Sequence, residues 1–297
     1  MSTYSQVGKI QELSNLVKQI SSEDTPFQTV IGKESSNSET FTWVEESLAT
    51  AGSNAVIEGA AFSSARAQNL ESHTNYTQLM DKTVSLTSSE QAALQAGAVH
   101  KMAYNIKQAT RELLRDKEFA YVGTAQSATP GAAGTSARKT AGYQAQIHTS
   151  MVRDMVAAPV TEAVLNGQLE ALFSAGAQPT HIMTSGAGKV HVSGVLNATR
   201  QRDIASTDKA AYGISVYMSD FGQVEIVPNR FVKYDGVNKG DILIFNPEMW
   251  TEKVLQEQGV REGVAKEHAD TKNVFVEAGL LHRNWKASAL ITNVKFK

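Results

Sequence analysis

The first apolar positions along the chain recur at helical spacing. Between residues 7 and 20 the spaced apolar positions are Val7, Ile10, Leu13, Leu16, Val17 and Ile20. This pattern predicts a short amphipathic helix that ends before Pro26, because the residue before proline favours an extended backbone. A helix of about 14 residues is marginal in water. Its apolar stripe therefore needs a surface, supplied by this chain or by another copy.

Two extended segments follow, separated by a long polar stretch. Phe41–Glu45 and Tyr76–Thr87 alternate apolar and polar residues, which is typical of strands. The residues between them are rich in Ala, Ser, Gly and Asn, and a connection of this length is usually functional or disordered. Because two strands alone are barely stable, we expect a projecting hairpin that becomes ordered on a neighbour.

From Ser88 to about Val122 the apolar period changes to 3.6 residues. At 1.5 Å per residue this predicts a helix about 50 Å long, capped by Ser88 or Ser89 and ended by Gly123. The following residues, Thr124 to Gly142, contain Pro and Gly and read as a flexible connector.

The remainder alternates helices and strands. We expect helices at Thr161–Ala175 and Gly188–Thr199, and one long extended segment at Val274–Phe296 in which Trp285 and Ile291 share a face. The expected strands in between are His181–Thr184, Ile214–Met218, Val224–Val227 and Asp241–Phe245.

Composition excludes several classes of protein. The 297 residues carry 28 Lys+Arg against 30 Asp+Glu, with no strongly basic stripe for a polyanion. Cysteine is absent, so disulfides, thiolate metal sites and a cysteine nucleophile are excluded. No signal-like start and no apolar run of 18 residues occurs, so we expect neither secretion by a cleaved signal nor membrane spanning.

Candidate chemical motifs are weak. Thr184–Val190 resembles a phosphate-binding loop, but Met183 replaces its first glycine and Val190 its hydroxyl residue, so a helix-entry turn is the better interpretation. His181 and His191 could meet, but a packing role is favoured over a metal site. Glu45 and Glu46 are neighbours on a strand, so their side chains should point to opposite faces of a solvated arm. We therefore expect no catalytic, cofactor-binding or metal-binding residues and no cofactor.

Charged clusters and tryptophans have structural interpretations. Arg111, Arg115 and Lys117 are interleaved with Glu112, Asp116 and Glu118, which indicates a solvated helix face or, as the sharper alternative, ion pairing between subunits. A second basic patch contains Arg200, Arg202 and Lys209. We interpret Trp43, Trp250 and Trp285 as core or interface anchors.

The order of these parts, together with several short stretches, carries a family resemblance. The stretches are Thr25–Phe27 through Ile31–Lys33, Phe41–Trp43, Ala137–Gly142, Ser219–Gly222 with Val227–Phe231, and Glu277–Gly279 leading to Trp285–Ala287. Over nearly its whole length, the chain resembles the major capsid proteins of tailed bacteriophages, with the Hong Kong 97 type fold.

The resemblance implies an α+β fold with named parts. They are an N-terminal arm at 1–35, an extended E-loop hairpin at 36–87, a peripheral domain at 88–159 with a spine helix at 88–122, an α/β axial domain at 160–250, and a return to the peripheral domain at 251–297. We match no covalent crosslink of the Lys–Asn kind to positions in this chain.

The resemblance also implies a structural rather than enzymatic function. We expect self-assembly with identical subunits, through pentamers and hexamers, into an icosahedral virion shell around double-stranded DNA that is contacted without specificity. A separate scaffolding protein and a portal are the expected partners, with a cement protein as a further candidate, and assembly would take place in the bacterial host cytoplasm. Two alternatives are an encapsulin-type nanocompartment and, in another class, an α/β hydrolase or ligand-binding protein using Ser185–Arg202.

Overall fold

The computed structural model describes residues 25–48, 51–59, 69–92, 101–199, 216–263 and 268–296. Apart from the first 24 residues, the chain divides into a smaller unit, Met80–Asp116 and Gln258–Val276, and a larger unit, Thr25–Leu79, Lys117–Glu257 and Glu277–Lys297. The helix predicted at residues 7–20 and the basic patch at Arg200, Arg202 and Lys209 lie outside the described residues.

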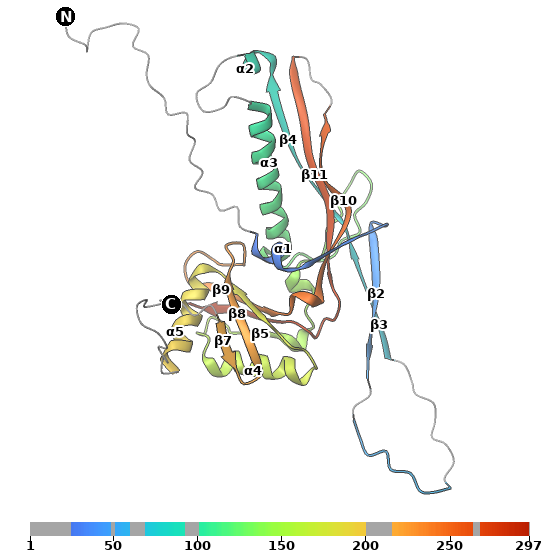
Figure 1. Cartoon of the computed structure of the whole chain (residues 1–297), viewed down its shortest axis with the longest axis vertical. Helices are drawn as coiled ribbons and strands as arrows, with labels where there is room; N and C mark the ends of the chain where they lie inside the picture. Colours follow the sequence, from blue (N-terminus) through green and yellow to red (C-terminus); the bar gives the residue numbers. More distant parts are fainter. Residues whose placement is uncertain are drawn as a thin grey trace, which may run out of the picture. The chain divides into compact units, whose positions relative to one another are not determined.

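The larger unit is built on a six-stranded sheet with the order β5-β12-β9-β6-β8-β7 (Figure 1). Its strands are β5 (Val152–Asp154), β6 (His181–Thr184), β7 (Val216–Ser219), β8 (Gly222–Pro228), β9 (Lys239–Phe245) and β12 (Ala289–Lys295). The run Ile242–Phe245 in β9 is wholly buried, as expected for a strand covered on both faces. The alternation of helices and strands predicted for this region is confirmed.

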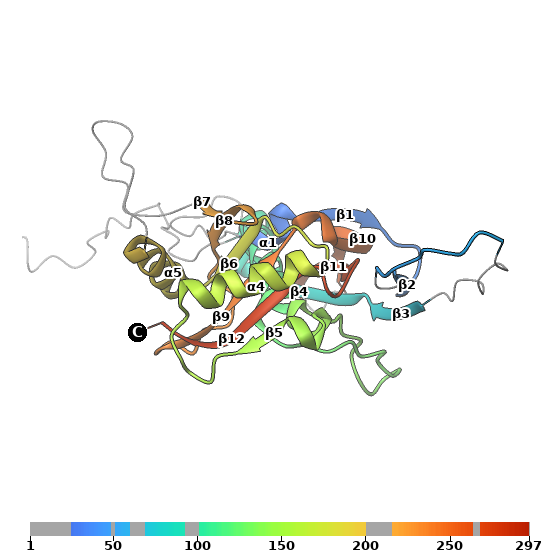
Figure 2. The same cartoon turned by 90° about the horizontal axis from the view of Figure 1, so that it is seen from below.

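Two helices pack on this sheet. Helix α4 (Glu162–Ser174) crosses the strands in Figure 2, and helix α5 (Gly186–Thr199) contacts β6, β8 and β9. Thr161 begins α4 as predicted, since its hydroxyl accepts a hydrogen bond from the backbone N–H of Val164 at 3.4 Å. Leu165, Leu169 and Leu172 line the buried face of α4.

A four-stranded sheet has the order β1-β10-β11-β4. It contains β1 (Gly32–Ser35), β4 (Gln78–Thr87), β10 (Trp250–Glu262) and β11 (Ala269–His282). Strand β1 runs parallel to β10, pairing Gly32 with Thr251 and Ser35 with Val254. Strand β10 was not predicted, because its apolar residues, Trp250, Val254, Leu255 and Val260, are irregularly spaced among charged and amide side chains and show no alternation.

The C-terminal region differs from the prediction of one extended segment. It forms β11 and β12, joined by a turn in which the backbone N–H of Ala287 donates to the carbonyl of Asn284 at 2.9 Å. Trp285 therefore lies in a turn and does not share a strand face with Ile291. Strand β12 lies between β5 and β9, so the last strand does not join the sheet that holds β4, contrary to the expected return of all of 251–297.

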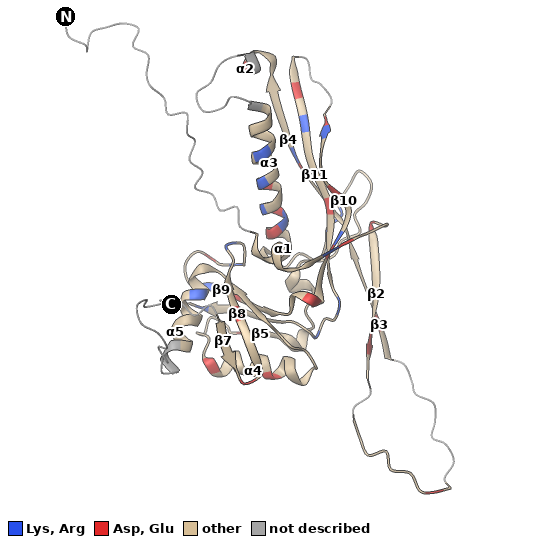
Figure 3. Cartoon of the chain, viewed as in Figure 1, with Lys and Arg blue, Asp and Glu red and all other residues tan. Residues whose placement is uncertain are grey.

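Two α-helices are described in the region that was predicted as one long helix. The structure describes α2 (Ser88–Ala92) and α3 (Lys101–Glu118), followed by the π-helical turn η2 (Phe119–Gly123), while residues 93–100 lie outside the described part. Ala109 and Leu113 form the buried stripe of α3 that the period predicted. Acidic and basic residues are interleaved along the rest of α3 (Figure 3).

Strands β2 (Thr40–Ser47) and β3 (Asn69–Tyr76) form a separate antiparallel hairpin. Its register runs from Thr40 paired with Tyr76 to Ser47 paired with Asn69. The prediction that 76–87 is the second strand of this hairpin is wrong, because β4 pairs in the four-stranded sheet instead. The hairpin's second strand is β3, which carries polar side chains at most positions and gave little apolar signal.

Candidate assembly surfaces

The β2–β3 hairpin has two different faces. On one face Phe41 is buried and Trp43 is half-buried, and they lie opposite Asn75 and His73. The other face exposes Val44 and Leu70, each with 57% of its surface accessible. Farther along the hairpin, Leu48, Val56 and Ile57 are also exposed, Ile57 by 85%. Apolar side chains gathered on one projecting element indicate a surface meant for contact.

Aromatic rings pack at the base of the hairpin. The His73 ring lies between Trp43, with ring centroids 5.8 Å apart, and Trp285, at 4.0 Å and stacked. The backbone N–H of Trp285 donates to Glu45 Oε1 at 2.9 Å. Glu45 and Glu46 do point to opposite faces, but the interpretation of Glu45 as part of a solvated arm is wrong, because its carboxylate is bound at this base. Trp43 and Trp285 are anchors, as predicted.

Hydrogen bonds and ion pairs also hold the base of the β2–β3 hairpin, near the start of β2 and the end of β3. Asn75 accepts from the backbone N–H of Ala141 at 2.8 Å and donates to the carbonyl of Leu280 at 2.6 Å. Arg138 donates from Nε to the carbonyl of Thr77 at 2.7 Å and forms ion pairs with Glu39 and Glu277. The connector predicted as flexible is therefore bound to the hairpin base at its last residues.

The end of the long helix carries buried charges. Lys117 Nζ lies 2.6 Å from Glu252 Oε1, which also accepts from the hydroxyl of Tyr121 at 3.0 Å. Both side chains of the pair are almost fully buried. Lys117 thus belongs neither to a solvated face nor to an ion pair between subunits, contrary to both interpretations of the interleaved charges.

Glu118 is also fully buried and accepts hydrogen bonds from helix α1 (Pro26–Val30). Its donors are the backbone N–H of Phe27 at 2.8 Å, the backbone N–H and side-chain amide of Gln28 at 3.1 and 2.9 Å, and the amide of Asn229 at 2.7 Å. Burial raises the pKa of Glu118, and these donors offset part of that shift. These hydrogen bonds attach helix α1, near the first described residue, to the rest of the larger unit.

The phosphate-loop-like turn is a helix entry, as predicted. Thr184 Oγ1 donates to the carbonyl of Asp241 at 2.9 Å, and Ser185 Oγ accepts from the backbone N–H of Gly188 at 3.2 Å. The Lys189 ammonium donates to the carbonyl of Ile226. The polar groups of this turn are therefore used inside the fold.

The histidines do not converge. His181 Nε2 lies 3.7 Å from Glu225 Oε2, whereas His191 Nε2 lies 3.3 Å from the carbonyl of Val160. Within the described ranges, no group of three or more His, Asp or Glu side chains is placed to hold a metal ion. The described helices also include none long and apolar enough to cross a membrane.

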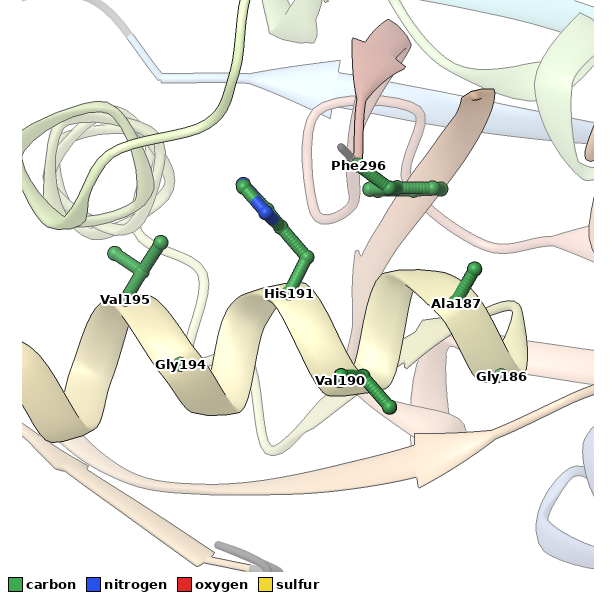
Figure 4. Close-up of a pocket in the computed structure, with 7 residues that line it drawn as sticks. All are labelled: Gly186, Ala187, Val190, His191, Gly194, Val195 and Phe296. Carbon is green, nitrogen blue, oxygen red and sulfur yellow. The ribbon is translucent and has the colours of Figure 1, made fainter. Parts of the chain in front are cut away.

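A shallow apolar groove of about 730 Å³ lies along α5 (Figure 4). Its lining consists of Gly186, Ala187, Val190, His191, Gly194, Val195 and Phe296. His191 is its single titratable side chain, so the groove has no converging polar groups of the kind that bind a small substrate. The α/β hydrolase alternative finds no support in this region.

The fold defines the class of protein. The structure superposes on a chain of the solved structure of Mycobacterium phage Bobi with a TM-score of 0.66 at 10% identity, covering 95% of each chain. A native gene-transfer-agent (GTA) particle capsid matches with a TM-score of 0.66 at 11% identity over 98% and 96% of the two chains. The SrpI encapsulin of Synechococcus elongatus matches with a TM-score of 0.62 at 10% identity over 98% and 94%. This is the Hong Kong 97 type fold of shell-forming proteins, as predicted.

Sequence comparison is more specific than the fold. The family model of the SU10 major capsid protein matches residues 1–295, and the chain belongs to that family. A curated major capsid protein of Escherichia phage Phieco32 is 26% identical, over 97% of this chain and 95% of that protein. The prediction of a tailed-phage major capsid protein is confirmed, and the encapsulin is a distant relative by fold alone.

Proposed function

We propose that identical copies of this chain assemble through pentameric and hexameric rings into an icosahedral shell that encloses phage double-stranded DNA. The observation that carries the proposal is the hairpin, which is fastened at its base but exposes apolar residues along its outer face. Exposure of apolar surface to water is unfavourable, so these residues should be buried by another molecule. In a family of shell-forming proteins, that molecule is an identical subunit. The role is structural, with no catalytic step.

The chain's parts receive roles in this proposal. Residues 1–35 act as the arm, 36–87 as the E-loop region with the hairpin at 40–76, 88–159 as the peripheral domain and 160–250 as the axial domain. Of the last region, β10 and β11 act as the return to the peripheral domain, while β12 completes the six-stranded sheet. A scaffolding protein and a portal act with the shell, a cement protein is a further partner, and DNA is contacted without sequence specificity. Assembly takes place in the host cytoplasm, and the product is the virion shell.

Electron microscopy of the expressed protein, alone and with its scaffolding protein, tests the proposal. The expected products are shells or rings with five or six copies, together with megadalton species in size-exclusion chromatography coupled to light scattering. A stable monomer under all conditions would contradict the proposal. Small particles filled with an enzyme, and without a neighbouring portal or terminase gene, would instead support the encapsulin alternative, which shares the fold.

The hairpin can be tested separately from the rest of the chain. Replacing residues 48–68 with Asn-Gly would join Ser47 to Asn69 by a two-residue turn and keep the paired register. Circular dichroism should show a folded protein, and electron microscopy should show no closed shells. Shells of normal size from this variant would show that the outer part of the hairpin is dispensable.

A further inference from the structure

Two exposed apolar surfaces lie at opposite ends of strand β6 in the larger unit. The first, here called the knob, consists of Phe173 at the end of α4 and Phe221 in the turn between β7 and β8. Their ring centroids are 5.4 Å apart, and Phe173 is 56% exposed. The chain passes from Phe173 into the start of β6, and β8 runs parallel to β6 from the same end, with His181 paired to Glu225.

The second surface is the groove along α5. Helix α5 begins directly after β6 ends at Thr184, so the groove lies at the other end of this strand. Gly186 and Gly194 carry no side chains to fill it, and Figure 4 shows Ala187, His191 and Val195 on the side of α5 that is turned toward Phe296. Val190 on its rim is 74% exposed. A concave apolar surface without converging polar groups suits a protein side chain rather than a small polar ligand.

The charges around the two surfaces are opposite. Glu170, one helical turn before Phe173, and Asp220, next to Phe221, are both exposed. Beside Phe296 in the groove, Lys295 and Lys239 are exposed register partners on β12 and β9, and Lys233 is exposed nearby. Two exposed acidic residues lie on this side, and both are bound within the chain. The Asp235 carboxylate accepts the backbone N–H groups of Val237, Asn238 and Lys239, and Asp154 accepts from the amide of Asn293 at 2.9 Å. The knob therefore has an acidic rim and the groove a predominantly basic one.

We propose that the Phe173–Phe221 knob of one copy binds in the α5 groove of the next copy within a ring. The inference rests on the proposed function, since it names the contact by which identical subunits associate. Surfaces at opposite ends of one strand do not meet within a chain. A contact between two different surfaces of identical subunits is heterologous and closes into a ring when the rotation allows. The opposite rims align the partners and disfavour knob-to-knob or groove-to-groove pairing.

Chemical crosslinking tests this contact directly, because the chain contains no cysteine. The double variant Phe173→Cys with Val190→Cys is assembled into particles, and the particles are treated with a short bis-maleimide. A denaturing gel should then show a ladder of crosslinked subunits that ends at five or six copies. Each single-cysteine variant should stay monomeric on the same gel. The matched control pairs Phe173→Cys with Val260→Cys, which replaces an exposed valine on another strand and should give no ladder.

The outcomes separate the contact from the proposed function. Particles of normal appearance without a ladder would overturn the knob-and-groove contact and leave shell assembly intact. Absence of rings and shells from the unmodified protein would instead contradict the proposed function.

A charge-reversal series tests the rims without relying on crosslinking. Glu170→Lys with Asp220→Lys should lower the yield of assembled particles at least about tenfold, since like charges then face each other. Adding Lys239→Glu and Lys295→Glu should restore assembly, while circular dichroism confirms that every variant is folded. Normal assembly of the first variant, or failure of the combined variant to recover, would overturn the proposed pairing of rims.

Discussion

The six-stranded sheet and the β2–β3 hairpin differ in what covers their apolar side chains. In β9 of the sheet, Ile242 to Phe245 are fully buried by other parts of the same unit. On the outer face of the hairpin, Val44 and Leu70 are more than half exposed, and among the described strands β2 and β3 pair only with each other. The apolar side chains of the sheet are buried within one chain, whereas those on the outer face of the hairpin remain to be buried by another molecule.

Because of this difference, mutations in the two regions should affect different properties, the stability of the subunit or the assembly of particles. Substitutions in the sheet and its packed neighbours should lower the free energy of unfolding of single subunits. Substitutions on the outer hairpin face should leave that free energy almost unchanged and act on particle formation.

The largest loss of stability is expected for Trp250→Ala. Trp250 is fully buried, stacks on Tyr143 at 4.6 Å between ring centroids and on His282 at 3.9 Å, and donates to Ser288 Oγ at 3.0 Å. Truncating a buried tryptophan costs about 3–5 kcal/mol. Urea unfolding of unassembled subunits, followed by circular dichroism, measures this loss. A change below about 1 kcal/mol would show that this cluster is not part of the stabilising core.

His282 should make stability depend on pH. Burial lowers the pKa of His282 from 6.5 to about 3. Above pH 6.5 the ring is neutral in both states, but between pH 6.5 and 3 only the unfolded chain binds the proton, so stability falls as pH falls. The expected contribution is a loss of about 2 kcal/mol at pH 5.

Urea unfolding at pH 8 and pH 5 gives the loss of unfolding free energy on acidification, for the wild type and for His282→Gln. The difference between these two losses is the contribution of His282. The variant should lose less stability on acidification than the wild type. Equal losses would contradict a neutral, buried His282.

A smaller effect is expected at the base of the hairpin. Trp43 is half-buried against Phe41 and His73, so Trp43→Ala should cost about 1 kcal/mol of unfolding free energy. Proteolysis of the hairpin should become faster in this variant, because one of the aromatic rings that pack at its base is removed. An effect as large as that of Trp250→Ala would mean that the hairpin base and the sheet core unfold as one unit.

The smallest stability effect is expected on the outer face of the hairpin. Val44→Lys with Leu70→Lys should change the free energy of unfolding by less than about 0.5 kcal/mol, yet prevent shell formation. Val156→Lys, at an exposed valine outside the hairpin, is the matched control and should assemble normally. If both variants assembled equally well, the exposed hairpin face would not be a contact surface.

The sequence was informative where one physical signal dominates. The apolar run in β9, the helix start at Thr161 and the period of α3 each predicted an element that the structure contains. Strand β10 was missed because partners on both sides bury its backbone while its side chains mix apolar and charged types. The C-terminal segment was read as one strand because Trp285 and Ala287 continue an alternation that the turn at Asn284 interrupts.

The assembly surfaces were predictable only in part. The exposed apolar residues of the hairpin follow from their isolation in a polar stretch, but Glu45 was read as solvated because its partner, the backbone of Trp285, is 240 residues away. The burial of Lys117 likewise depends on Glu252, which adjacent residues do not reveal. The groove is lined by residues of α5 and by Phe296, which follows β12, so its formation depends on the sheet order.

The position of β12 has a consequence for biosynthesis. Strand β5 pairs with β12, and β12 separates β5 from β9 in the sheet. Until residues 289–295 have left the ribosome, β5 lacks its partner strand and the edge of β9 is uncovered. Translation products truncated before β12 would carry an open sheet edge, so only a chain synthesised through residue 295 can complete this sheet.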